Sequence, residues 1–322
     1  MKKLLLILNP NAGLQKARKL LADTVAIFAK YGYLSTVCVT AKRGDGTEFA
    51  QDLAGEHDLV VASGGDGTLN ETITGLMRGG HAVPLGYIPA GSTNDFASSL
   101  GLSSDILRAA RDIMEGCPQP LDIGRFRNRY FSYTASFGAF TSTSYSTPQN
   151  VKNVLGHAAY VLEGIKDLPN IRPQNVCLEA DGQSYEGEYL FGAVCNSTSL
   201  GGVLKLAPSM VDMNDGLFET LLIRNPGNAI ELQSILTALT ARKYDNPMLT
   251  FVRASKLVFQ ADPNMPWTLD GEYAEGAREI TVENIRSAIT LMVPEKKDEE
   301  SSACKQRRKN DPPVFLSGGS FF

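Results

Sequence analysis

Short apolar runs alternate with longer amphipathic segments over the first third of the chain, and this order restricts the fold more than any other feature of the sequence. Runs of this length predict buried strands, and the longer segments predict helices. The predicted order is strand 3–8, helix 15–31, strand 34–40, helix 46–54, strand 58–62, helix 69–79, strand 83–88 and a helix that ends near residue 115. Because such alternation is typical of a parallel sheet with helices on both faces, it predicts an α/β domain whose ligands bind beyond the carboxyl ends of the strands.

The composition is that of a globular protein large enough for two domains. The chain has 322 residues, of which 43% are hydrophobic and 20% are charged. A net charge of −4 gives no reason to expect a nucleic-acid partner. No apolar stretch approaches the length of a membrane-spanning helix. The five cysteines form no C-x-x-C pair, which favours reduced thiols and a cytoplasmic protein.

The pattern changes after about residue 120, where short β-rich segments separated by turns replace the alternation. These segments are Tyr130–Ser136, Val176–Leu178, Tyr189–Cys195, Leu217–Ile223, Lys256–Gln260, Glu279–Val282 and Ala288–Val293. Helical patterns at 149–167 and 228–242 interrupt them. We therefore predict an α/β domain over residues 1–120 and a mostly antiparallel β-domain over 121–294. Residues 295–322 are charged and then rich in Pro, Gly and Ser, so a disordered tail is expected there.

Residues Gly64–Thr68 read Gly-Gly-Asp-Gly-Thr and join a predicted strand to a predicted helix. Glycines at such a junction let phosphate oxygens approach the backbone N–H groups of the helix N-terminus. The segment lacks the lysine of a P-loop, and Asn70 stands where the dinucleotide fingerprint needs its third glycine. Asp66 cannot bind an anion, so it needs another task, such as positioning magnesium-bound water. Two further turns, Asn9–Gly13 and Ala90–Asp95, also follow strands, and we expect the three turns to form one rim.

The tetrapeptide of Gly65–Thr68 recurs at Gly44–Thr47, but at a different place relative to its strand. That strand is predicted to end at Thr40, so the second copy lies several residues past the rim and is expected to cap the next helix. Thr40 itself lies at the strand end, where it either contacts a nucleotide or caps the strand.

The three turns extend into longer motifs, Asn9–Gly13, Gly64–Glu71 and Gly91–Ala97. Further motifs follow in order at Leu121–Gly124, Gly156–Tyr160, Lys205–Pro208, Asn214–Leu217 and Leu269–Glu272. Together they resemble the diacylglycerol kinase catalytic domain family, which includes soluble bacterial diacylglycerol kinases and the sphingosine and ceramide kinases. The resemblance covers about residues 3–294.

The resemblance implies an α/β nucleotide domain similar to that of phosphofructokinases, a β-sandwich second domain and an active site in the cleft between them. It also implies a set of residues that contact ATP. These are Asn9, Pro10, Asn11, Ala12, Gly13, Thr40, Gly64, Gly65, Asp66, Gly67, Thr68, Leu69, Asn70, Glu71, Ser92 and Thr93.

The metal and proton-transfer residues are also taken from the resemblance. Asp66, Asp95 and Asp122 would hold the catalytic magnesium and its waters, and Asp270 would be the general base, with Glu272 assisting. A structural magnesium would be bound by Asp212, Asp215 and the backbone carbonyl of Leu217. Without the resemblance, the Asp-Gly pairs in these two segments would be read as ordinary turns between strands.

The activity implied is ATP-dependent phosphorylation of a lipid hydroxyl, with diacylglycerol as the first candidate acceptor. The alternatives are a kinase for another lipid such as phosphatidylglycerol or sphingosine, an NAD kinase, which shares the Gly-Gly-Asp-Gly-Thr loop, and a regulator that binds nucleotide or lipid without turnover. Such an enzyme would meet its lipid substrate by transient docking at the inner face of the membrane. A homodimer is also possible. Candidate docking stretches are Arg125–Arg129, which is equally compatible with an ordinary hairpin, and Lys305–Lys309, most simply a solvated charge run.

Overall fold

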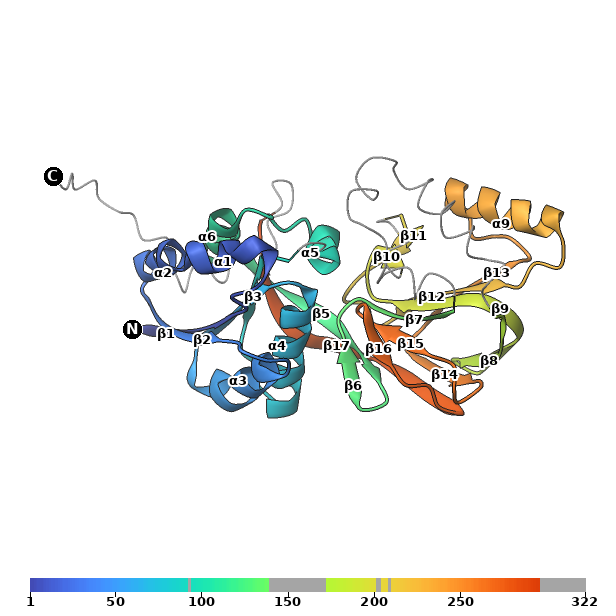
Figure 1. The fold of residues 1–322 in the computed structure, drawn as a ribbon, viewed down its shortest axis with the longest axis horizontal. Helices are drawn as coiled ribbons and strands as arrows, with labels where there is room; N and C mark the ends of the chain where they lie inside the picture. The colour runs from blue at the N-terminus through green and yellow to red at the C-terminus, as the bar shows by residue number, and fades with distance from the viewer. Residues whose placement is uncertain (92–93, 139–171, 201–203, 208–209, 296–322) are drawn as a thin grey trace. The chain divides into compact units, whose positions relative to one another are not determined.

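The computed structural model describes residues 1–91, 94–138, 172–200, 204–207 and 210–295 (Figure 1). The helix expected at 149–167 and all but the first residue of the expected tail lie outside these ranges. The described chain divides into two compact units. One contains Met1–Leu121 with the segment that starts at Ala288, and the other contains Asp122–Ser287.

The first unit has α/β architecture. Its elements are β1 (Lys2–Leu8), η1 (Gly13–Gln15), α1 (Lys16–Lys19), α2 (Leu21–Lys30), β2 (Tyr33–Val39), α3 (Asp45–Leu53), η2 (Ala54–Glu56), β3 (Leu59–Gly64), α4 (Asp66–Gly79), β4 (Leu85–Pro89), α5 (Asp95–Leu100) and α6 (Ile106–Glu115). The sheet order is β17-β4-β3-β1-β2, and these pairs are parallel. The predicted parallel sheet is therefore confirmed.

The continuous apolar run of β1 reflects burial of this sheet on both faces. Helices α1, α2 and α6 lie on one face and α3 and α4 on the other (Figure 1). Leu4, Leu6 and Leu8 pack in one cluster with Phe28 of α2 and Ile113 of α6. Since successive side chains of a strand point to opposite faces, the intervening residues of β1 face α3 and α4.

Three predicted helix boundaries differ in the structure. The expected helix 15–31 is divided at Leu20, whose φ and ψ of −99° and 12° separate α1 from α2. The expected helix after β4 is also two helices, because Gly101 ends α5 in the left-handed conformation. Helix α4 begins at Asp66 rather than Leu69, which brings the aspartate into the first helical turn.

The second unit consists mainly of antiparallel strands. Its elements are the end of β5 (Cys117–Phe126), β6 (Arg129–Phe131), β7 (Thr134–Gly138), β8 (Gln174–Ala180), β9 (Gln183–Cys195), β10 (Ser199–Leu200), β11 (Leu204–Lys205), β12 (Phe218–Arg224), α9 (Ala229–Ala241), β13 (Leu249–Ala254), β14 (Lys256–Gln260), β15 (Trp267–Leu269), β16 (Glu272–Ala274) and most of β17 (Glu279–Val293). The order is β16-β15-β7-β9-β8-β14-β17, and β12 pairs with both β9 and β13.

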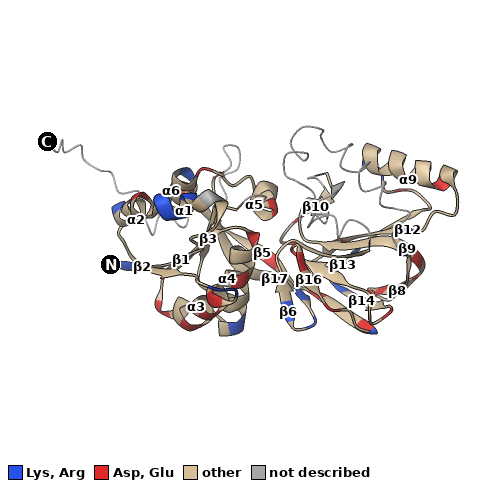
Figure 2. Ribbon diagram, viewed as in Figure 1, with Lys and Arg blue, Asp and Glu red and all other residues tan. Residues whose placement is uncertain are grey.

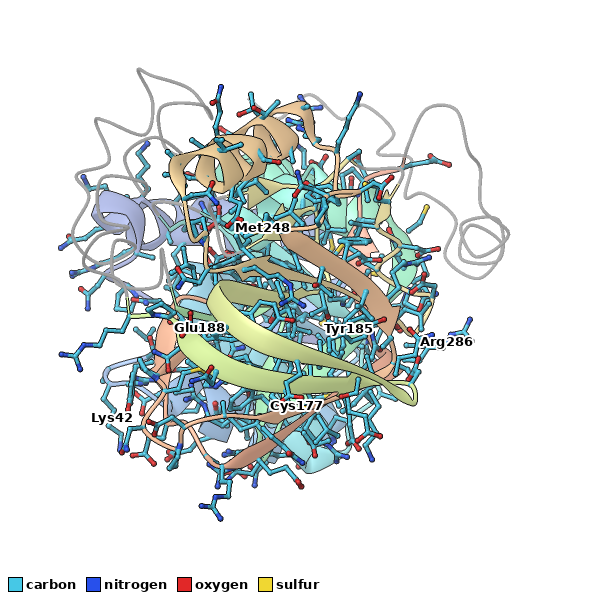
Figure 3. The ribbon with its side chains drawn as sticks, turned by 90° about the vertical axis from the view of Figure 1, so that its right-hand side faces the viewer. Lys42, Cys177, Tyr185, Glu188, Met248 and Arg286 are labelled. Carbon is cyan, nitrogen blue, oxygen red and sulfur yellow. The ribbon has the colours of Figure 1, made fainter. Side chains whose placement is uncertain are left out.

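Strand β9 is long enough to pair with different partners along its length. Its first half pairs with β8, and its second half lies between β7 and β12. Figure 3 shows the β8–β9 hairpin, with Cys177 labelled on β8 and Tyr185 on β9. Trp267 is fully buried and packs against Phe126, Phe137 and Phe259 in the core.

Helix α9 covers the other face of the β9–β12 pair. Its Ile235, Ala238 and Leu239 share a cluster with Leu221, whereas the adjacent Leu222 belongs to the aromatic core. This alternation places one apolar layer on each face of the sheet. The helix expected at 228–242 is therefore confirmed.

The end of the chain differs from the sequence prediction. The strands expected at Glu279–Val282 and Ala288–Val293 are one strand, β17, which continues through Ser287 at a φ of 50°. Its last residues belong to the first unit, where Leu291 pairs with Leu85 of β4, whereas the sequence analysis assigned them to the second domain. Strands β5 and β13 were not anticipated, because prolines mark the start of β5 and β13 has no alternating pattern.

Cys38, Cys177 and Cys195 are free thiols, as expected. Cys117 is disulfide-bonded, so the expectation of reduced thiols is wrong at that position.

Candidate functional site

The carboxyl ends of the first unit's parallel strands meet at one rim. The N–H of Asn9, after β1, donates to the carbonyl of Ser63 in β3 at 2.9 Å. The N–H of Ala90, after β4, donates to the carbonyl of Gly64 at 2.8 Å. The three turns thus follow adjacent strands and are linked through their backbones, which confirms the expected rim. We call Asn9–Gly13 the first loop, Gly64–Thr68 the second and Ala90–Asp95 the third.

Glycine is required where these loops approach one another. A Cβ on Gly91 would lie 2.6 Å from the Cα of Gly65. A Cβ on Gly13 would overlap with the carbonyl oxygen of Ala90, and Gly13 also has a φ of +51°. The first, second and third loops therefore pack backbone against backbone, an approach that only residues without a Cβ permit.

Two carboxylates lie at this rim. Asp66 begins α4, and its Oδ2 accepts a hydrogen bond of 3.0 Å from the N–H of Asp95, the first residue of α5. The side-chain amide of Asn9 donates to Oγ1 of Thr68 at 3.3 Å, which ties the first loop to the same turn of α4. One or two carboxylates beside phosphate oxygens suit Mg²⁺, so Asp66 and Asp95 fit the catalytic ion expected here.

Glu71 connects α4 to the second copy of the tetrapeptide. Its carboxylate accepts hydrogen bonds from the N–H groups of Gly44 and Gly46 at 2.8 and 3.1 Å. Gly44 is the N-cap of α3, so this segment caps the helix as expected. The role of Glu71 in this cap could not be read from the sequence, because its partners lie 25 and 27 residues away. Its contact with ATP stays a prediction.

Thr40 also lies at the rim. Its N–H donates to the carbonyl of Leu8 at 2.9 Å, and its hydroxyl lies 3.4 Å from the same oxygen. These bonds are those of a strand cap, and a nucleotide contact by Thr40 remains a prediction. Ser92 and Thr93, two further residues expected to contact ATP, lie outside the described residues.

Two residues that the sequence analysis did not select, Tyr87 and Asn94, link the second and third loops. The Tyr87 hydroxyl lies 3.3 Å from both the carbonyl oxygen of Gly64 and Oδ1 of Asn94. The Asn94 side chain in turn accepts from the N–H of Gly91 and donates to its carbonyl. Asn94 adopts a φ of 51°, which asparagine tolerates better than most residues.

Asp122 has a different environment from Asp66 and Asp95. It begins the second unit and is buried, and its two carboxylate oxygens accept 2.7 Å hydrogen bonds from the N–H groups of Gly216 and Ser287. Both carboxylate oxygens of Asp122 thus already have backbone partners within the second unit. Its metal role stays a prediction.

Asp270 lies in the second unit at a tight turn. Its Oδ2 accepts from the N–H of Ser132 at 2.6 Å, and Oδ1 accepts from the N–H groups of Tyr133 and Thr134 at 3.0 Å. Three of the roughly four acceptor positions of a carboxylate are thus used, which fixes its orientation. Glu272 lies two residues away, with its carboxylate 3.9 Å from the Arg129 guanidinium.

The residues expected to bind a structural magnesium lie in a turn before β12. Oδ1 of Asp212 accepts from the N–H of Asn214, and Oδ1 of Asp215 accepts from the N–H of Leu217. Oδ2 of Asp215 forms an ion pair with Arg253, which also pairs with the fully buried Glu219. Burial raises the pKa of Glu219 to about 7, although Arg253 opposes this shift.

No group of three or more His, Cys, Asp or Glu side chains within the described ranges is arranged as a metal site. A site completed by substrate phosphates, or by a backbone carbonyl, does not need such a group. Two histidines of the described ranges make hydrogen bonds within the first unit. His57 bonds to the carbonyl of Leu53 and to Thr36, and His81 bonds to the carbonyl of Gln51.

Comparison with known proteins agrees with this architecture. Residues 3–126 match the model of the diacylglycerol kinase catalytic domain, and residues 137–293 match that of the YegS C-terminal NAD kinase beta sandwich-like domain. A protein named diacylglycerol kinase from Bacillus subtilis (strain 168) is 35% identical over 301 residues, which are 93% of this chain and 99% of the relative. One of the same name from Staphylococcus carnosus (strain TM300) is 32% identical over 296 residues, which are 91% and 96% of the two chains.

Solved structures from Bacillus anthracis str. Sterne have the same fold. One is 26% identical and superposes with a TM-score of 0.75, covering 91% of this chain and 97% of the other. Another, described as a diacylglycerol kinase, is 23% identical with a TM-score of 0.69 and the same coverage. These matches confirm an α/β domain followed by a β-sandwich. Among the described helices, none has both the length and the apolar character needed to cross a bilayer.

Proposed function

Since this chain belongs to the diacylglycerol kinase family, we propose that it transfers the γ-phosphate of ATP to the free hydroxyl of diacylglycerol, giving phosphatidic acid. The observation that carries the proposal is the rim of the first unit, where backbone contacts join the loops Asn9–Gly13, Gly64–Thr68 and Ala90–Asp95. In phosphoryl transfer the protein mainly positions the reactants and stabilises charge, and this rim supplies the means for both.

The phosphates of ATP would bind at the N-terminus of α4. Gly65 is the N-cap of this 14-residue helix and has no side chain to occupy the first-turn N–H groups. The helix dipole adds a partial positive charge at the same end. The exposed basic residues of α1, Lys16, Arg18 and Lys19, directly follow the first loop and add positive charge to this part of the chain (Figure 2).

Asp66 and Asp95 would hold the magnesium ion, together with phosphate oxygens and water. When bound, the ion neutralises charge on the β- and γ-phosphates. Asp270 would accept the proton of the lipid hydroxyl as it attacks, while the N–H groups of Ser132, Tyr133 and Thr134 hold the carboxylate in one orientation. Glu272, two residues further on, would assist.

The acceptor can be tested directly. We would incubate the full chain with labelled ATP and mixed micelles that contain diacylglycerol, phosphatidylglycerol or sphingosine, and include NAD in a separate reaction. Labelled phosphatidic acid as the main product would support the proposal. Phosphorylation of NAD alone, or ATP binding without any labelled product, would favour the corresponding alternative.

We also propose that Asp215 takes part in a structural magnesium site with Asp212 and the carbonyl of Leu217. If so, Asp215→Ala should remove the part of the melting-temperature rise that depends on magnesium, because an ion bound only by the folded state stabilises it by mass action. The ion pair of Asp215 with Arg253 is lost in the same variant. The melting temperatures of both proteins are therefore measured in magnesium and in EDTA. If the variant melts lower than the wild type by the same amount in both, the effect comes from the lost ion pair and Asp215 binds no magnesium.

The route to the lipid would be docking on an anionic membrane surface. Arg125–Arg129 forms the β5–β6 hairpin, in which Arg125 pairs with Glu283, and Arg129 bonds to the carbonyl of Tyr273. The exposed Arg127 lies at the turn with a φ of 55°. Lys305–Lys309 lies outside the described residues. Of the three arginines in this hairpin, we therefore choose Arg127 as the candidate for a membrane contact, since it is exposed at the turn.

We expect Arg127→Glu to reduce the stimulation of activity by anionic lipid roughly fivefold or more, since one basic residue near such a surface contributes about 1 kcal/mol and the change reverses its charge. Activity is measured on vesicles with and without anionic lipid, at low and high salt, and on a short-chain soluble diacylglycerol. Arg278→Glu makes the same charge change at another exposed position and serves as the control. Equal responses of the two variants would exclude the hairpin as the docking site.

A further inference from the structure

Tyr87 is a buried polar residue next to the residues proposed to hold magnesium. It lies in the middle of β4, its neighbour Ile88 packs against α1, α2 and α6, and the alternation of the strand therefore directs Tyr87 to the opposite face. Only 2% of Tyr87 is exposed. A tyrosine buried to this degree usually has a partner for its hydroxyl.

The surroundings of this hydroxyl are unusual because they consist of acceptors from two loops. The carbonyl of Gly64, from the second loop, and Oδ1 of Asn94, from the third, each lie 3.3 Å away. The aspartates of the same two loops are joined by the bond from the Asp95 N–H to Asp66 Oδ2. The Tyr87 hydroxyl thus bridges the loop that carries Asp66 and the loop that carries Asp95.

The phenolic hydroxyl of Tyr87 carries one proton, and the Gly64 carbonyl oxygen and Asn94 Oδ1 lie at equal distances as its two acceptors. The hydroxyl can therefore donate to either loop without moving.

We propose that Tyr87 is a positioning residue that sets the separation of Asp66 and Asp95 and so increases the affinity of the first unit for magnesium-bound ATP. This inference rests on the proposed function. A hydroxyl donor to the acceptors of both loops limits how far the loops move apart, and two carboxylates bind one ion well only when their spacing is held. The effect should therefore be large when magnesium is present and small when it is absent.

The test is Tyr87→Phe, which keeps the ring and removes only the bridging hydroxyl. Binding of a non-hydrolysable ATP analogue to the full chain is measured by calorimetry in magnesium and in EDTA. We expect the dissociation constant to rise about tenfold in magnesium, in line with the loss of one hydrogen bond, and less than about threefold in EDTA. In kinetics, KM for ATP should rise while kcat changes little.

The matched control is Tyr189→Phe. Tyr189 is also fully buried, and its hydroxyl has no hydrogen-bond partner among the described residues. This variant should bind the analogue as the wild type does. If Tyr87→Phe weakened binding of the analogue equally in magnesium and in EDTA, Tyr87 would be a structural residue only. A lower melting temperature with unchanged binding would lead to the same conclusion. Either result would overturn this inference and leave the proposed function standing. Failure of the wild-type chain to bind the analogue would overturn the proposed function as well.

Discussion

Replacing Asp270 by asparagine is expected to lower kcat by 10²-fold or more, because an amide cannot accept the proton of the lipid hydroxyl. The same change has a structural effect. The asparagine NH₂ would face at least one of the backbone N–H groups of Ser132, Tyr133 and Thr134, at a cost of about 1–3 kcal/mol. Steady-state kinetics on the purified variant, corrected for the folded fraction at the assay temperature, separate the two effects.

Asp45→Asn is the control for removing the charge of a buried carboxylate that accepts backbone hydrogen bonds. The N–H groups of Lys42 and Ala41 donate to Asp45 and lower its pKa, and Asp45 has no proposed part in the reaction. Both bonds reach Oδ2, so the asparagine carbonyl oxygen can accept them, and this variant should keep kcat within a few-fold of the wild-type value. If folded Asp270→Asn enzyme also retained near wild-type kcat, Asp270 would not be the general base.

Replacing Gly13 by alanine is expected to separate the first loop from the third and to weaken ATP binding at least tenfold. The added Cβ would overlap with the carbonyl oxygen of Ala90, and both groups belong to the backbone, so neither can move without shifting its loop. The left-handed conformation of Gly13 adds a cost of about 1–2 kcal/mol for any residue with a Cβ. Denaturant unfolding and the melting shift caused by ATP measure the two effects.

Gly80→Ala isolates the conformational part of this cost. Gly80 has a φ of +65°, and a Cβ there would meet nothing within 4 Å. This variant should lose only the conformational contribution and should bind ATP normally. If the two alanine variants lost the same stability and both kept ATP affinity, the close approach of the first and third loops would have no role in binding.

Strands β1 and β3 of the first unit could be predicted from the sequence because their environment is nearly uniform along each run. Leu4–Leu8 and Leu59–Val61 are fully buried, so hydrophobicity alone identifies them. The order of helices and strands then placed the three turns at one edge. Asn9, Asp66 and Thr68 belong to these turns, and the structure joins the turns by hydrogen bonds.

The remaining parts of the site depend on contacts between residues distant in sequence. Glu71 caps a helix that begins 26 residues earlier, and Tyr87 bridges the loops that follow β3 and β4. Asp122 accepts an N–H from Ser287, 165 residues away. In each case the residue type is ordinary for a helix, strand or turn, so only the folded arrangement reveals the role.

Strands β5 and β17 each begin in one unit and end in the other, so the first unit is not one continuous stretch of sequence. Its sheet ends at the short pairing of β17 with β4, where Leu291 is fully buried. A fragment that stops at Leu121 would lack β17, so the backbone of β4 would lose this neighbour and the side chains that β17 covers would be exposed. An open sheet edge of this kind promotes aggregation. A hydrolytic cut between the units would therefore not release an intact nucleotide-binding half. Fragment complementation with a peptide spanning Ala288–Val293, or a circular permutant that fuses this peptide to Met1, is the natural way to obtain that half alone.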